Sequence, residues 1–150
     1  MMQDRFKFRG KRLDNNEWYY GSYLYLHNTD EFDWSGIRHS TKKDVHFIID
    51  ENDVNYAVSP ETISQCTGLK DKNGKLIYEG DVVKIPDNYD IYGMFAGEVR
   101  EIYYNEGFRL KPKWDKNSRG NWLEDTEDLE VIGNIHENPE LLEVENDDRD

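Results

Sequence analysis

The sequence predicts a mainly β protein, in which N-terminal β-hairpins pack with a small SH3-like β-barrel, one short internal helix and a short C-terminal helix. Three observations predict this fold class. Apolar and polar residues alternate over short runs, which is typical of strands. Turn-forming residues, chiefly Asn, Asp and Gly, separate these runs. Aromatic residues make up 13% of the 150 residues, so the chain is expected to fold although 34% of its residues are charged.

Two hairpins are predicted in the N-terminal part of the chain. In the first, Phe6 and Phe8 alternate with basic residues, and a polar turn leads to the aromatic run at 18–26. Because this run is aromatic on both faces, we expect both of its sides to be at least partly covered. The polar stretch at 27–44 is expected to be irregular. The second hairpin places alternating apolar residues on either side of the turn DEND at 50–53.

Two short helices are predicted from their capping residues. The internal helix begins with Ser59 as N-cap and Pro60 at the first helical position, and Gly68 can supply its left-handed stop. Its low apolar content keeps it short. The C-terminal helix begins with Asn138 as cap and Pro139 at the first helical position, ahead of two leucines.

The small barrel is predicted between these helices, where short strands alternate with glycine-bearing turns. Asn73-Gly74 is a tight-turn signal, and the run YEGDVV at 78–83 followed by a G-E-V strand is the pattern expected at the first corner of an SH3-like barrel. We therefore divide the chain into a hairpin region at 1–58 and a second region at 59–150, which ends in an acidic tail. Both regions are expected to form one compact unit.

The charge of the chain limits the kinds of molecule that it can be expected to bind. There are 32 acidic and 19 basic residues, for a net charge of -13. Such a surface repels the phosphates of nucleic acids and disfavours anionic membranes. Cys66 is the only cysteine, which excludes an intramolecular disulfide, and no apolar run is long enough for a membrane helix. The N-terminus lacks the apolar block of a secretory signal, so we expect a cytoplasmic protein of a bacterial host cell.

The residues that could take part in catalysis do not indicate an enzyme. The segment HENPE at 136–140 has a Glu where a zinc-protease motif needs its second His, and Pro139 interrupts the helix that the motif requires. Cys66 is expected near the negative C-terminal end of the internal helix, which disfavours a thiolate. No two histidines have the spacing of a local metal site; they are His27, His39, His46 and His136. We therefore assign no catalytic residue, cofactor or metal.

The aromatic residues are the better lead to function. Several tryptophans lie in polar stretches, where partly exposed aromatic side chains mark protein interfaces. The segment at 111–119 combines basic residues with a tryptophan and could stack single-stranded nucleic acid. The candidate partner-binding residues are Trp34, Trp114, Trp122, Lys111 and Lys113.

Three blocks of the sequence are distinctive: FKFRGKR at 6–12, QCTGLKDKNGKLIYEGDVVKI at 65–85 and EVIGNIHENPELL at 130–142. In their residues and their order, these blocks resemble the YopX family of phage and prophage proteins. Cys66 and His136 depart from the family pattern, which usually has aromatic residues at these positions, and this argues against a chemical role for either. The resemblance implies a mainly β fold with a barrel-like part and an accessory role in phages, and it implies no established enzymatic activity.

Together these observations predict a phage or prophage accessory protein that is a non-enzymatic protein-binding or self-assembling β module. Its partner would be an unknown host or phage protein, or a second copy in a homo-oligomer. Two alternatives stay open. The acidic surface could mimic nucleic acid and inhibit a host DNA- or RNA-binding protein, or the loop at 111–119 could bind nucleic acid itself.

Overall fold

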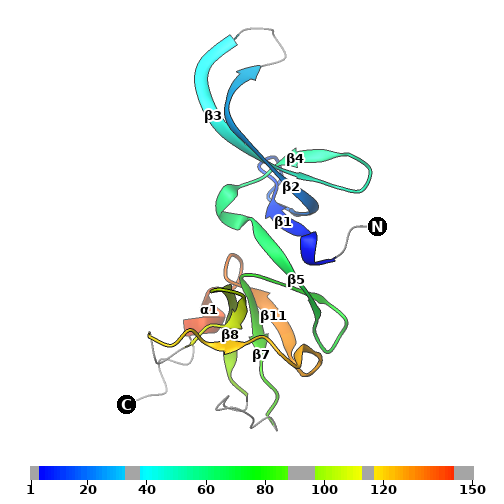
Figure 1. The fold of residues 1–150 in the computed structure, drawn as a ribbon, viewed down its shortest axis with the longest axis vertical. Coiled ribbons are helices and arrows are strands. Elements are labelled where there is room, and N and C mark those ends of the chain that lie inside the picture. Colours follow the sequence, from blue (N-terminus) through cyan, green and yellow to red (C-terminus); the bar gives the residue numbers. More distant parts are fainter. Residues whose placement is uncertain (1–3, 33–37, 88–96, 113–116, 144–150) are drawn as a thin grey trace. The chain divides into compact units, whose positions relative to one another are not determined.

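The structure, a computed structural model, describes residues 4–32, 38–87, 97–112 and 117–143 (Figure 1). It confirms a mainly β chain, with two antiparallel sheets and very little helix. The chain divides into two compact units, Met1–Gln65 and Cys66–Asp150, whereas the sequence analysis placed the division at 58/59.

Unit 1 is an antiparallel sheet with the strand order β4-β3-β2-β1-β5. The stretch at 27–44, expected to be irregular, instead lengthens the two central strands, because β2 continues to Phe32 and β3 starts at Arg38. Pairing between β2 and β3 holds this polar segment in strands, with irregularities in register after Leu26 and Asp30. The strands are β1 (Phe8–Lys11), β2 (Trp18–Phe32), β3 (Arg38–Ile49), β4 (Asn55–Ala57) and the first residues of β5 (Ser64–Lys70).

The predicted internal helix at 59–68 is wrong. Only a 3-10 turn, η2 (Pro60–Thr62), forms before the chain enters β5. Ser59 makes no side-chain cap, and the hydroxyl of Thr62 instead accepts the backbone N–H of Lys11 at 2.8 Å. Ser64 then pairs with β1, so sheet pairing prevails over the local capping signal. Cys66 accordingly lies buried in a strand and not at a helix end.

Unit 2 holds the rest of β5, which pairs with β6, and a five-stranded sheet of order β10-β9-β8-β7-β11. The predicted SH3-like barrel is not confirmed. Within the described residues this sheet is open, because its edge strands β10 and β11 each pair with one neighbour. The strands are β6 (Leu76–Tyr78), β7 (Asp81–Lys84), β8 (Val99–Tyr104), β9 (Phe108–Leu110), β10 (Asn121–Trp122) and β11 (Glu130–Asn134).

Helical structure is confined to single turns. Two further 3-10 turns are η1 (Asp4–Phe6) and η3 (Thr126–Asp128). The predicted C-terminal helix is only a short piece, α1 (Glu140–Glu143), and Val144 lies outside the described residues.

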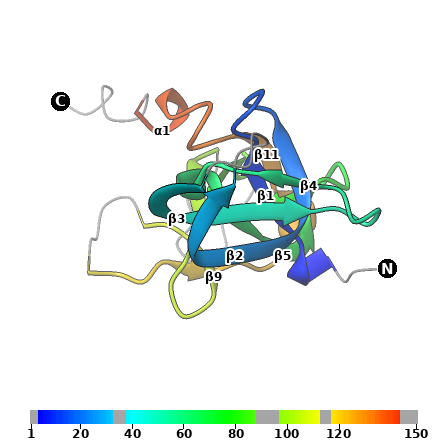
Figure 2. The same ribbon diagram turned by 90° about the horizontal axis from the view of Figure 1, so that it is seen from above.

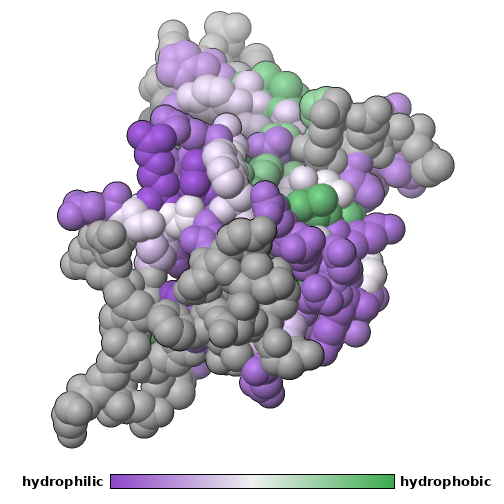
Figure 3. Space-filling view, turned by 60° about the horizontal axis from the view of Figure 1, so that its bottom comes forward, coloured by the Kyte–Doolittle hydropathy of each residue, from purple (hydrophilic) through white to green (hydrophobic). Residues whose placement is uncertain are grey.

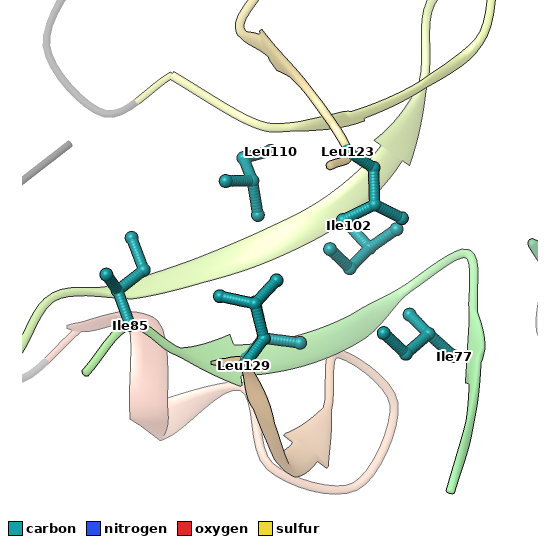
Figure 4. Packing of buried hydrophobic residues seen from close by; sticks show 7 residues of the cluster. Ile77, Ile85, Ile102, Leu110, Leu123 and Leu129 are labelled. Carbon is teal, nitrogen blue, oxygen red and sulfur yellow. The ribbon is translucent and has the colours of Figure 1, made fainter. Parts of the chain in front are cut away.

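The core of unit 2 is an aliphatic cluster whose side chains point toward one another (Figure 4). Phe108 and Val131 pack against it from the side. Burying each of these large aliphatic side chains contributes about 1.5–3 kcal/mol, so the cluster is the main source of this unit's stability. The cluster consists of Ile77, Val83, Ile85, Ile102, Leu110, Leu123 and Leu129.

A buried carboxylate fixes the turn between β5 and β6. Oδ1 of Asp71 accepts the backbone N–H groups of Asn73 and Lys75, both at 2.9 Å. Its other oxygen accepts the N–H of Val131 in β11 at 3.0 Å, from 60 residues away. Burial raises the pKa of this carboxyl, but the three N–H donors outweigh burial and hold the pKa below its ordinary value of 3.8.

The turn between β3 and β4 repeats this arrangement in unit 1. Oδ1 of Asp50 accepts the N–H groups of Asn52 and Val54, at 2.8 and 3.0 Å. The fourth residue of each turn has a left-handed backbone, with φ of 61° at Asp53 and 78° at Gly74. The two turns therefore share one hydrogen-bonding pattern and differ in the residue at this position.

Asp71→Asn should destabilise unit 2 by about 2–3 kcal/mol, because an amide cannot accept on both sides and leaves at least one buried N–H without an acceptor. The native carboxyl has a lowered pKa. Its stabilisation is thus fully present above the ordinary carboxyl pKa and is lost as pH falls through the native value. Urea unfolding of both proteins between pH 7 and about pH 2 tests this. The difference should shrink on acidification, whereas the exposed control Glu127→Gln should differ little from wild type at any pH.

Candidate protein-binding surface

The hairpin of β2 and β3 is the part of the described structure where apolar side chains reach the surface on both faces. The strands lie side by side, with regular pairing from Ser22 opposite Ile49 to Leu26 opposite Val45 (Figure 2). No charged residue occurs at 18–26 or 45–49, although 34% of the chain is charged. On the molecular face in Figure 3, by contrast, hydrophilic residues predominate and hydrophobic residues form small separate groups.

One face of this hairpin carries Tyr23, Tyr25, His27 and His46, and we call it the Tyr/His face. Tyr25 lies opposite His46, and their rings stack with centroids 4.9 Å apart. The hydroxyl of Tyr23 lies 2.6 Å from Nδ1 of His46, and that of Tyr25 lies 3.1 Å from Nδ1 of His27. These contacts fix the rings, while Tyr23 and Tyr25 remain 36% and 45% exposed.

Asp44 joins the outer end of the Tyr/His face. Its Oδ1 lies 2.8 Å from Nδ1 of His27, so the two form an ion pair when the imidazole is protonated. A hydrogen bond to Asp44, and then burial, raise the pKa of Tyr25 above its ordinary value. Asp44 thus accepts from the ring groups beside it and helps to hold them in place.

The opposite face of the hairpin is apolar, and we call it the leucine face. Leu24 and Leu26 point to this side, and each is 39% exposed. Phe47 and Val45 lie opposite them in β3 and are partly buried. The hairpin therefore offers an aromatic face and a leucine face, both accessible in the described structure although each is still partly covered.

A clamp of polar and aromatic contacts fixes the base of the hairpin. The hydroxyl of Tyr19 donates to a carboxylate oxygen of Asp50, and its ring meets Tyr56 edge-on with centroids 4.9 Å apart. The guanidinium of Arg12 lies 3.4 Å from the Tyr56 ring centroid, and it pairs with Asp14 through two hydrogen bonds. The clamp holds β2 against the β3–β4 turn, from which the hairpin extends.

The titration of the clamp reflects these contacts. Burial, together with the hydrogen bond to Asp50 and its charge, raises the pKa of Tyr19 to about 12. The same hydrogen bond lowers the pKa of Asp50 against the effect of burial, with help from the N–H groups of Val54 and Asn52. Tyr19 is therefore a neutral donor and Asp50 a charged acceptor at neutral pH.

Trp34, Trp114 and Lys113, three of the predicted partner-binding residues, lie outside the described residues. Of the other two, Trp122 lies in β10 of unit 2 and Lys111 directly follows β9. Trp122 is 51% exposed, and its ring centroid lies 3.5 Å from the guanidinium of Arg109, the residue opposite it. Lys111 pairs with Glu101 at 3.0 Å. Arg109 thus covers one face of the Trp122 ring, and Glu101 balances the charge of Lys111.

The basic loop at 111–119 has a second described cation, Arg119, which pairs with Glu106. Both described cations of this loop are therefore next to carboxylates, which reduces its positive potential. The sequence analysis did not single out the Tyr/His face. Its signal is the alternation of Tyr23, Tyr25 and His27, but the partner His46 is identified only by the register of β2 and β3.

Two other places in unit 2 carry side chains that could take part in chemistry, an open hollow and the buried Cys66. The open hollow of about 490 Å³ is lined by basic and acidic side chains. Two of them form an ion pair, in which Nζ of Lys72 lies 3.2 Å from Oε2 of Glu130. Cys66 is fully buried, with the N–H of Gly68 at 3.4 Å from its sulfur. Among the described residues, His, Cys, Asp and Glu side chains form no group of three that could hold a metal ion.

The sequence of the chain matches a known protein family. The model of the family described as YopX protein matches residues 7–143. The chain belongs to the YopX family. The match includes both Asp turns, the hairpin and the three sequence blocks that resemble the family, apart from Phe6 at the start of the first block.

Similar proteins are also found among solved structures. The crystal structure of protein EF1440 from Enterococcus faecalis is 29% identical in sequence, covers 91% of this YopX chain and 96% of its own chain, and has a TM-score of 0.45. A search of the curated proteins finds no match. Within the described ranges, every helix is too short or too polar to span a membrane.

Gly21→Ala should break the hairpin at its base. A Cβ at this position would collide with the backbone carbonyl of Ile49, and backbone cannot move aside as a side chain can. We expect a loss of about 3 kcal/mol in unit 1 and faster hydrogen exchange of the amides at 22–26 and 45–49. Ser22→Ala, one residue along the same strand, is the control. Unchanged exchange in the Gly21 variant would contradict the close approach of β2 and β3.

Proposed function

We propose that this YopX-family chain is a non-enzymatic phage or prophage accessory protein, which binds another protein through the β2–β3 hairpin. The observation that carries the proposal is the exposure of tyrosine and leucine side chains on both faces of the hairpin, in the stretch where residues 18–26 and 45–49 carry no charge, in a chain of net charge -13. Exposed aromatic and aliphatic groups that are free of neighbouring charge are typical of the centre of a protein interface.

The fixed geometry of the Tyr/His face supports this proposal. An interface has to order its side chains at a cost of about 0.5–1.5 kcal/mol for each mobile one. Tyr23 and Tyr25 are already held by His46 and His27, so they would be ordered before a partner arrives. Their rings supply large contact areas with polar hydroxyl ends, the combination that is enriched among interface anchors.

Site-specific photo-cross-linking in the natural bacterial host tests the proposal. A photoreactive phenylalanine analogue at Leu26 should give one defined adduct with another protein, because Leu26 lies on the exposed leucine face. The same analogue at the exposed Glu127 in unit 2 is the matched control. The double substitution Tyr23→Ser and Tyr25→Ser should reduce the Leu26 adduct at least about tenfold, as expected for the loss of interface anchors. Equal labelling from both positions, or none from Leu26, would count against the hairpin.

A second candidate function is mimicry of nucleic acid, with inhibition of a host DNA- or RNA-binding protein. The observation that favours it is the run of exposed carboxylates just before and within η3 in unit 2, at Glu124, Asp125, Glu127 and Asp128. A complex of this kind should dissociate as salt rises to about 0.5 M and should be lost when these acids become amides, while the hairpin variants bind normally. The nucleic-acid-binding alternative has less support, because Lys111 and Arg119 are both paired with carboxylates.

A further inference from the structure

We propose that two copies of the chain associate by pairing their β2 strands antiparallel, edge to edge, with the two Leu24 residues opposite each other. The two hairpins would then form one continuous sheet. This inference deepens the proposed function and rests on it, because it uses the same hairpin, but it uses the edge of β2 and leaves the Tyr/His and leucine faces open.

The edge of β2 loses its neighbour part-way along the strand. β1 pairs with β2 only from Trp18 to Gly21, where Phe8 ends the contact. β3, in contrast, accompanies β2 through Leu26 and beyond. Within the described residues, β2 from Ser22 onward therefore has a strand on one side only.

The backbone of β2 directs its polar groups into this open edge. Alternate residues of an antiparallel strand point their N–H and C=O groups to opposite sides. The carbonyl of Glu17 accepts the N–H of Arg12, so the odd-numbered residues of β2 direct their backbone N–H and C=O groups toward the side where β1 lies. Pairing is regular from there to Leu26, and Tyr23 and Tyr25 thus present their backbone groups at the open edge.

The other strand of the hairpin gives the same direction independently. The carbonyl of His46 accepts the N–H of Val58 at 2.9 Å, on the outer side of β3. Tyr25 lies directly opposite His46, so its backbone groups must point away from β3. Edge groups of this kind are a template for an added strand.

The charge pattern favours a second copy as the occupant. An acidic chain that recognises a basic segment would be expected to place carboxylates beside it, yet the edge at 18–26 and the strand behind it at 45–49 carry no charge. Edge strands are commonly guarded by Lys or Pro, and neither occurs here. Like charges opposite each other destabilise strand pairs, so this uncharged stretch is where two copies of net charge -13 can meet.

Symmetry and the two ends of the regular open edge determine the register, because β1 occupies Gly21 and the pairing of β2 with β3 becomes irregular after Leu26. Two identical surfaces that pair about a two-fold axis place one residue opposite itself. With Leu24 on the axis, the uncharged residues 22–26 pair among themselves, and Tyr23 of one copy faces Tyr25 of the other. A longer overlap would bring the second strand to Gly21, where β1 already lies.

Single cysteines in the otherwise native chain test the register. Leu24 and Leu26 are matched, since they share a strand, a face and an exposed fraction of 39%. Across a non-hydrogen-bonded pair the Cα atoms lie about 4.5 Å apart, which a disulfide can bridge. Mild oxidation should therefore link most of the Leu24→Cys chains into dimers and at least about tenfold fewer Leu26→Cys chains, whose position pairs with Ser22. Cys66 is fully buried and should not react in wild type.

Sedimentation equilibrium of the wild-type chain provides the second measurement. We expect twice the 17.9 kDa chain mass at micromolar to millimolar concentration, with association that strengthens as salt screens the charge of the two copies. A monomeric mass, or equal cross-linking at both cysteines, would overturn the proposal. A monomer that still gives the Leu26 photo-adduct would overturn self-association alone, whereas a dimer without any adduct to another protein would overturn the proposed function alone. Association that weakens with salt would also overturn the proposal, because salt should reduce the repulsion between two copies of net charge -13.

Discussion

The fold of unit 2 depends on a buried carboxylate that serves two places at once. One oxygen of Asp71 closes the β5–β6 turn through the N–H groups of Asn73 and Lys75, and the other accepts from Val131 in β11. A neutral side chain of the same size cannot do both, because it has one acceptor where the structure needs two. The turn and the last strand are therefore linked through one side chain, which lies in the sequence block at 65–85.

The same device positions the candidate surface in unit 1. Asp50 closes its turn through Asn52 and Val54, and its second oxygen accepts from Tyr19, the first part of the clamp at the base of the hairpin. A turn carboxylate with a distant second partner thus organises both units. In unit 2 that partner secures a core, whereas in unit 1 it secures an exposed ribbon.

Local patterns in the sequence predicted what local forces decide. Alternation around 45–49 and the Asn73-Gly74 turn correctly indicated strands and a tight turn, since side-chain period and backbone conformation follow from neighbouring residues. The helix expected after Ser59 was wrong because Lys11 and Arg9, far away in sequence, pair with that segment. The Tyr/His face was missed for the same reason: Tyr25 meets His46 only through the β2–β3 register, which no single run of residues determines. The family, in contrast, was correctly recognised from contiguous blocks.

The two Asp turns differ at their fourth position, and this difference predicts which of the two turns opens more easily. Glycine takes the left-handed backbone of the unit 2 turn without strain, whereas Asp53 takes it in unit 1 at a cost on the order of 1 kcal/mol. The turn that supports the exposed ribbon is accordingly the weaker of the two. Fluctuations should loosen the ribbon of unit 1 while the aliphatic core of unit 2 stays folded, so the chain can adapt its contact surface to a partner without unfolding that core.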